Sequence, residues 1–144
     1  RVLGETRDGR AAAPLAEILR SSADLNMRAQ AACALGKIGS LQSVDRLKSA
    51  LADREWQVRA QAATALGALG DPESVAALAT AIEDESWWVR RNCAEALGRL
   101  GSQGRQALLQ LSASPDRYVR ERCLAALEGL NAPATDRQVS QVPQ

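Results

Sequence analysis

The sequence lacks histidine and phenylalanine altogether, and its 144 residues include only one tyrosine, three tryptophans and three cysteines. Without histidine the chain cannot form a Ser-His-Asp or Cys-His catalytic arrangement, an HExxH zinc helix or a mixed Cys/His zinc site. With so few aromatic residues, the core must be built from aliphatic side chains and alanine. No run of 18 apolar residues occurs and the N-terminus shows no signal-peptide pattern, so we expect neither a membrane span nor an export signal.

The cysteines and clustered carboxylates show no spacing that is typical of a metal, disulfide or catalytic site. Cys33, Cys93 and Cys123 lie within predicted helices, are odd in number and show no CxxC spacing. We interpret them as small buried apolar groups in a reducing compartment, which favours the cytoplasm, with thiol chemistry as the alternative. The acidic run at 83–85 is expected to be a solvated loop rather than a pair of catalytic carboxylates. We therefore predict no catalytic site, no metal and no cofactor.

What the chain does contain is an internal repeat. Val58-Arg59 recurs as Val89-Arg90 and Val119-Arg120, and loosely as Met27-Arg28, at offsets of 30 or 31 residues. A second motif, Ala-Leu-Gly-x-x-Gly, stands at 34–39, 65–70 and 96–101, with a blurred copy at 126–131.

Each repeat has the periodicity of two helices. Apolar residues at 58, 62, 65, 66 and 69 form one helical stripe, and those at 75, 78, 79 and 82 form a second. Gly70 ends the first helix and Asp71-Pro72 makes the turn. One such hairpin buries too little apolar surface to offset the roughly 1–2 kcal/mol of backbone entropy that each ordered residue loses. The hairpins must therefore stack, about 31 residues per repeat.

The alignment sets the boundaries. We predict a partial repeat at 1–20 (the end of a first helix plus a second helix), repeats at 21–52, 53–83 and 84–113, a terminal first-type helix at 114–130, and a disordered tail or linker at 131–144. The third repeat has one residue fewer in its internal turn, Gly101 to Gly104. Because the sequence starts inside a repeat, we expect it to be a fragment of a longer protein.

The stretch from Asp53 to Pro72, Asp-x-x-Trp-x-Val-Arg-x-x-Ala-Ala-x-Ala-Leu-Gly-x-Leu-Gly-Asp-Pro, resembles the HEAT-like repeats of the phycobilisome-lyase type. The resemblance implies an all-α, right-handed α-solenoid whose second helices line a concave face, in a family of binding and scaffolding modules. It does not imply lyase activity. The absence of histidine separates the chain from the HEAT-repeat metal hydroxylases, which need His-Glu ligand pairs.

In the resembled family, an Asp and an Arg six residues apart link successive units in a ladder of charge-assisted hydrogen bonds. The pairs with this spacing here are Asp53-Arg59 and Asp84-Arg90. At both ends the nearest acid is only four residues away, so the ladder is not expected to include Arg28 or Arg120. Phosphate capture by the stacked arginines is the alternative. Similarly, the three GxxG elements match a nucleic-acid clamp, but their periodic recurrence favours helix endings.

Aromatic residues stand at the start of the first helices. Trp56 aligns with Trp87, and Trp88 aligns with Tyr118. Because two adjacent tryptophans are hard to bury together, we expect Trp87 or Trp88 to be partly exposed on a ridge where units meet, as an anchor for a partner. Packing between repeats is the alternative. On the second helices, the positions off the core stripe form a surface that has mostly small side chains, is neutral overall and can hydrogen-bond: Asp45, Arg46, Ser49, Ala76, Ala77, Thr80, Gln106 and Gln110.

The net charge is only +1, and residues 53–85 form an acidic band between two mildly basic ends. These features favour a non-catalytic scaffold that binds a polypeptide on its concave face and aromatic ridge. Two alternatives stay open. One, from the family name alone, is an accessory subunit of a lyase or a cofactor-handling enzyme. The other is nucleic-acid binding through the basic C-terminal half: Arg90, Arg91, Arg99, Arg105, Arg117 and Arg122.

Overall fold

A computed structural model describes residues 9–131. In that range the chain forms eight α-helices and no strand: α1 (Gly9–Ser21), α2 (Leu25–Ile38), α3 (Val44–Ala50), α4 (Trp56–Leu69), α5 (Val75–Ala81), α6 (Trp87–Gly98), α7 (Gly101–Leu111) and α8 (Arg117–Asn131). Short 3-10 turns, Leu41–Ser43 and Pro72–Ser74, precede α3 and α5. The predicted helix end at 1–4 lies outside the described residues, as does the predicted tail apart from Asn131.

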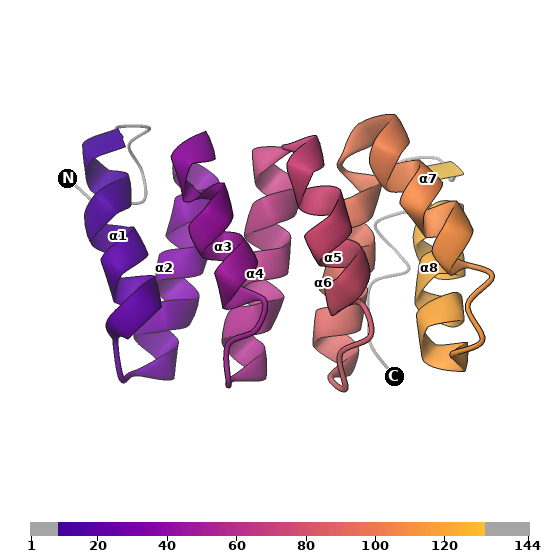
Figure 1. Cartoon of the computed structure of the whole chain (residues 1–144), viewed down its shortest axis with the longest axis horizontal. Helices are drawn as coiled ribbons and strands as arrows, with labels where there is room; N and C mark the ends of the chain where they lie inside the picture. Colours follow the sequence, from indigo (N-terminus) through magenta and orange to yellow (C-terminus); the bar gives the residue numbers. More distant parts are fainter. Residues whose placement is uncertain (1–8, 132–144) are drawn as a thin grey trace.

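The helices form two layers along the long axis of the molecule. In Figure 1, α1, α3, α5 and α7 lie in front, and α2, α4, α6 and α8 lie behind them. We call these the second-helix layer and the first-helix layer. The predicted all-α stack of helical hairpins is confirmed. The right-handed sense of the superhelix stays a prediction.

Glycines end two of the first helices. Gly39 and Gly70 adopt left-handed backbone angles (φ 76° and 70°), and their N–H groups donate to the carbonyls of Leu35 and Leu66. In the third repeat the turn is shorter, so Gly101 (φ 74°) starts α7 directly and no 3-10 turn intervenes. The structure thus shows the GxxG elements at helix ends, as their periodicity indicated.

The first glycine of the first two motifs serves close packing, whereas the first glycine of the third, Gly98, faces only the Leu130 side chain. A Cβ on Gly36 would lie 2.9 Å from the Cα of Ala65 in the next unit, and one on Gly67 would lie 2.9 Å from the Cα of Ala96. Neighbouring first helices therefore approach to backbone contact, which only a glycine facing an alanine permits.

An aliphatic core lies between the two layers. The largest completely buried side chains recur at matching positions of successive units: Leu35, Leu47, Val58, Leu66, Leu78, Ile82, Val89, Leu97, Leu108 and Val119. Cys93 and Cys123 belong to this core, and burial raises the pKa of their thiols to about 12 and about 11. A thiol that stays protonated is a poor nucleophile, so both cysteines act as packing groups. Cys33 is half-buried. Among residues 9–131, no helix is long and apolar enough to cross a bilayer.

Candidate binding surface on the first-helix layer

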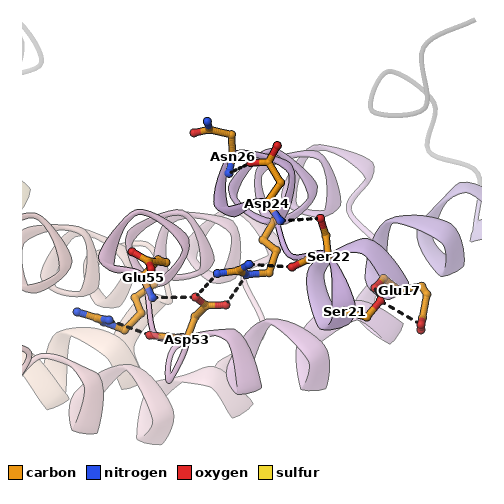
Figure 2. Close-up of polar contacts among 9 residues, drawn as sticks. Glu17, Ser21, Ser22, Asp24, Asn26, Asp53 and Glu55 are labelled. Carbon is orange, nitrogen blue, oxygen red and sulfur yellow. Dashed lines mark hydrogen bonds and ion pairs between the residues drawn. The ribbon is translucent and has the colours of Figure 1, made fainter.

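Arginine–aspartate pairs join successive units. Arg28 donates from Nε and Nη2 to the two carboxylate oxygens of Asp53, both at 3.0 Å. Dashed lines mark the hydrogen bonds that Asp53 accepts in Figure 2. Arg59 makes the same bidentate contact with Asp84, at 2.7 and 3.1 Å. All four side chains are largely buried. Each pair spans 25 residues and fixes the start of one first helix against the start of the next.

Two expectations about this ladder need correction. Arg28 is part of it, although the acid four residues earlier, Asp24, only caps α2 through the N–H of Asn26. The six-residue spacing is misleading because the carboxylate comes from the following unit. Within a unit, Arg59 contacts only the backbone carbonyl of Asp53, at 2.8 Å. Conversely, the Nε of Arg90 is buried and has no hydrogen-bond partner, so Arg90 pairs with no carboxylate through that atom.

The ladder makes stability depend on pH. Burial alone would raise the pKa of Asp53, but hydrogen bonds from Arg28 and from the N–H of Glu55 outweigh it and hold the pKa below its usual value. We expect Asp53→Asn to lower the free energy of unfolding by about 1–3 kcal/mol at pH 7. A carboxylate with a lowered folded-state pKa stabilises fully above its unfolded-state pKa, and this stabilisation is lost as pH falls through the folded-state pKa. The difference in unfolding free energy between variant and wild type should therefore narrow as pH falls below about 4.

Urea unfolding at pH 7, 5 and 3 measures this difference in unfolding free energy. Asp45→Asn is the matched control, because the Asp45 side chain is 95% exposed and contacts only Lys48, at 3.7 Å. A difference in unfolding free energy that increased on acidification would contradict the assigned role of Asp53.

Aromatic and arginine side chains cluster at the beginning of α4, α6 and α8. Trp56 and Trp88 are 40% and 39% exposed and Tyr118 is 62% exposed, whereas Trp87 is half-buried. The rings of Trp87 and Trp88 meet edge to face, with centroids 5.0 Å apart. Trp88 is therefore the more exposed member of the pair.

Arginines cover the faces of these rings. The Arg91 guanidinium lies 5.9 Å from both Trp87 and Trp88, and that of Arg122 lies 5.2 Å from Trp87. Arg91 also pairs with Glu95 at 3.2 Å. These cation–π contacts hold the indoles in place, so a partner would meet a preorganised aromatic surface.

A hollow of about 540 Å³ opens beside this cluster, and its wall comes entirely from α2, α4 and α6. It is lined by Ala29, Trp56, Gln57, Ala60, Gln61, Thr64, Trp88, Arg91, Asn92 and Glu95. Trp56 and Trp88 thus contribute to one site although the repeat register pairs Trp56 with Trp87. Alanines and amides make up much of the remaining wall. We call this site the tryptophan hollow.

Two amides of the hollow differ in their contacts. Asn92 donates from Nδ2 to the carbonyl of Ala60 at 3.1 Å, which fixes its orientation across the α4–α6 junction. Gln57 Oε1 is buried and has no hydrogen-bond partner. An unsatisfied buried acceptor costs roughly 1–3 kcal/mol. Sequence reasoning missed these residues, yet Gln57, Gln61 and Thr64 form an i, i+4, i+7 polar stripe that marks the exposed face of α4.

The predicted second-helix positions lie on the other layer. Asp45, Ser49, Ala76, Thr80, Gln106 and Gln110 are exposed on α3, α5 and α7, whereas Arg46 and Ala77 are half-buried. The hydroxyls of Ser49 and Thr80 already donate to carbonyls one turn earlier, at 3.2 and 3.1 Å. This surface is therefore separate from the tryptophan hollow and has fewer free donors than its composition indicates.

No group of three or more acidic or cysteine side chains that could hold a metal ion occurs within residues 9–131.

Three known structures have a similar fold. Human deoxyhypusine hydroxylase in complex with glycerol matches 85% of this chain at 32% identity with a TM-score of 0.69, over 43% of its own length. A chain in the structure of the CpcE–CpcF complex of phycocyanin lyase from Nostoc sp. PCC7120 matches 92% of this chain at 23% identity with a TM-score of 0.67. The match covers 57% of that chain's own length. An engineered protein matches 86% of this chain at 22% identity with a TM-score of 0.55, over 38% of its own length. The chain thus spans less than two thirds of the length of each of these three proteins.

The likeness to the hydroxylase corrects one expectation. The absence of histidine does not separate this chain from HEAT-repeat hydroxylases in fold, because the packing of Ala, Leu and Gly that builds the hairpins needs no histidine. A search of curated proteins found no match. The family model for HEAT repeats matches residues 1–56 and 45–128. Since these matches cover most of the sequence and the structure shows the stacked helical hairpins, the chain belongs to the HEAT-repeat family.

Proposed function

We propose that this chain is a non-catalytic interaction module that binds a polypeptide partner, with the tryptophan hollow as the main contact. The observation that carries the proposal is the pair of partly exposed tryptophans, Trp56 and Trp88, lining one hollow. Tryptophan is enriched among residues that dominate binding energy at protein interfaces. The second-helix positions, on the face that the resemblance predicts to be concave, are proposed as a secondary contact.

The lining of the hollow suits a peptide. Ala29 and Ala60 leave room between the indoles for apolar side chains. Gln57 lines the hollow and its buried Oε1 has no hydrogen-bond partner, so we expect its amide to turn toward a backbone N–H of the partner. Arg91 and Glu95 neutralise one another, so the site does not select strongly for either sign of charge. Such a mixture of aromatic, small and amide groups is typical of sites that recognise extended polypeptide.

The ordered scaffold lowers the cost of binding. The cation–π contacts of Arg91 and the Asn92–Ala60 hydrogen bond hold the lining side chains before a partner arrives. Less side-chain entropy is then lost on association, and more of the contact energy appears as affinity.

The test begins with affinity capture from a lysate, with and without nuclease, followed by calorimetric titration of the recovered partner. Replacing Trp56 or Trp88 with alanine should weaken binding by about 30-fold or more, because each truncation removes a central anchor worth about 2 kcal/mol. Circular dichroism should show both variants fully folded.

Tyr118→Ala is the matched control, since Tyr118 is the more exposed aromatic but does not line the hollow. Affinity that fell with Tyr118→Ala and was unchanged by the tryptophan variants would place the partner elsewhere.

Several of the arginines proposed for nucleic-acid binding already have partners. Arg91 and Arg117 pair with Glu95 and Glu121, and Arg105 donates to Asn131. The carboxylates of Glu95 and Glu121 neutralise two of these arginines, which weakens their attraction for a phosphate backbone. Binding that disappears with nuclease and falls steeply with salt would nevertheless favour nucleic acid over the proposed polypeptide.

A further inference from the structure

The arginine ladder is interrupted at its third position. In Arg28 and Arg59, Nε and Nη2 form the edge that holds the aspartate of the following unit. In Arg90, Nη1 donates to the carbonyls of Asp84 and Glu85, both at 2.9 Å, but the buried Nε has no partner. The atom that is unsatisfied in Arg90 is therefore the one that binds carboxylate in the two complete pairs.

Ser114 occupies the position of the missing aspartate. The carbonyl of Ser114 accepts from Arg120 Nη1 at 3.0 Å, just as the carbonyls of Asp53 and Asp84 accept from the arginines six residues after them. Its Oγ accepts the N–H of residue 116 at 3.1 Å, matching the carboxylates of Asp53 and Asp84, which accept from residues 55 and 86 at 2.9 and 2.8 Å. What is absent is a carboxylate that binds the arginine of the preceding unit, as Asp53 and Asp84 do.

We propose that Ser114 is a phosphorylation site and that its phosphate completes the third step of the ladder by binding Arg90. Ser114 is the only serine or threonine in the sequence that is followed by proline, which matches the substrate pattern of proline-directed protein kinases. It is partly exposed in the short loop between α7 and α8, where the neighbouring residues 113 and 115–117 are exposed.

The modification is a phosphoryl transfer from a nucleoside triphosphate. The Ser114 hydroxyl attacks the γ-phosphorus, the bond to the leaving nucleoside diphosphate breaks, and the hydroxyl proton passes to a base of the kinase. The product carries close to two negative charges at pH 7 and three strong acceptor oxygens.

The surroundings of Ser114 favour this charge on balance. Arg90 offers planar guanidinium donors, and its central carbon lies 5.0 Å from the centroid of the Tyr118 ring, which places it beside the start of α8. Arg120 contacts the Ser114 carbonyl, and the start of α8 adds the positive end of a helix dipole. Asp116, which caps α8 through the N–H of Tyr118, and Glu85, whose carbonyl accepts from Arg90, oppose it. A bidentate arginine–phosphate contact is the strongest of these interactions.

The test uses the full chain with phosphoserine incorporated at position 114. Its melting temperature should exceed that of the unmodified chain by about 3–6 °C, as expected for two charge-assisted hydrogen bonds in a protein of this size. The gain should disappear in Arg90→Gln. Phosphoserine at position 112 is the matched control, because Ser112 lies in the same segment and its hydroxyl donates to Leu109 rather than occupying the aspartate position. An equal gain at 112, or in Arg90→Gln, would overturn the proposal.

Two further measurements decide the outcome if Arg90→Gln does not fold. Phosphorus NMR should show a lower phosphate pKa in the folded phosphorylated chain than in urea, because Arg90 stabilises the dianion; equal values would refute the contact.

Incubation of the folded chain with a proline-directed kinase and ATP should add phosphate to Ser114, which mass spectrometry detects. No incorporation at Ser114 would refute the site. Stabilisation of the unmodified chain by inorganic phosphate alone, to the same extent, would show a free-anion site instead.

Discussion

Replacing Leu66 with alanine should lower the free energy of unfolding by about 2–5 kcal/mol. Leu66 is completely buried in α4, in the middle of the array, and its equivalents Leu35 and Leu97 are equally buried on either side. Removing its isobutyl group leaves a cavity in a close-packed aliphatic core. Because each repeat is stabilised by its neighbours, the loss should reach beyond α4. Urea unfolding followed by circular dichroism measures the total, and hydrogen exchange measures how far the loss extends.

Leu109→Ala is the control for this experiment. Leu109 is 54% exposed on α7, so the same truncation there should change the stability by well under 1 kcal/mol. Increased exchange confined to α4 in Leu66→Ala, with α2 and α6 still protected, would contradict the coupling of repeats.

We expect Gly104→Ala to destabilise the chain by about 3 kcal/mol or more, because there is no room for a methyl group. A Cβ at this position would lie 1.8 Å from the carbonyl oxygen of Leu97 and 2.9 Å from its carbonyl carbon. Both atoms are backbone, so only a displacement of α7 relative to α6 can relieve the overlap. The cause is the shortened turn of the third repeat, which brings the start of α7 directly against the end of α6. Thermal and urea unfolding measure the effect.

The same substitution at Gly129 should have the opposite sign. No atom lies within 4 Å of a Cβ at Gly129, in α8, so alanine there should stabilise the helix by about 0.5–1 kcal/mol. If both glycine variants were neutral, the close approach of α7 to α6 at Gly104 would be wrong.

Much of the fold is predictable from sequence because each element is specified locally. The stripe at 58, 62, 65, 66 and 69 predicts α4, and Gly70 marks its end. The missing residue between Gly101 and Gly104 predicts an altered turn, although not the continuation of Gly101 into α7. Periodicity and glycine conformation act within a few residues, so one sequence carries the information.

The candidate site was less predictable because it depends on contacts between units. Pairing Trp56 with Trp87 by register gave no indication that Trp56 and Trp88 line the same hollow. The ladder illustrates the same limit, since Arg59 binds Asp84, 25 residues away, while the conspicuous spacing to Asp53 reflects only a backbone contact. Repeat alignment identifies equivalent positions but does not say which neighbour a long side chain reaches.

The glycine–alanine and arginine–aspartate contacts make the segment 53–83 a module with complementary ends. Toward the preceding unit it presents Ala65 and Asp53, and toward the following unit it presents Gly67 and Arg59. A duplicate of this segment inserted after residue 83 would find a matching contact at both of its boundaries. Tandem duplication could therefore lengthen the array without any compensating substitution. A duplicate of 84–113 would likewise match Arg90 to Asp84 at its new boundary and would keep the single mismatch at Ser114 that the chain already has.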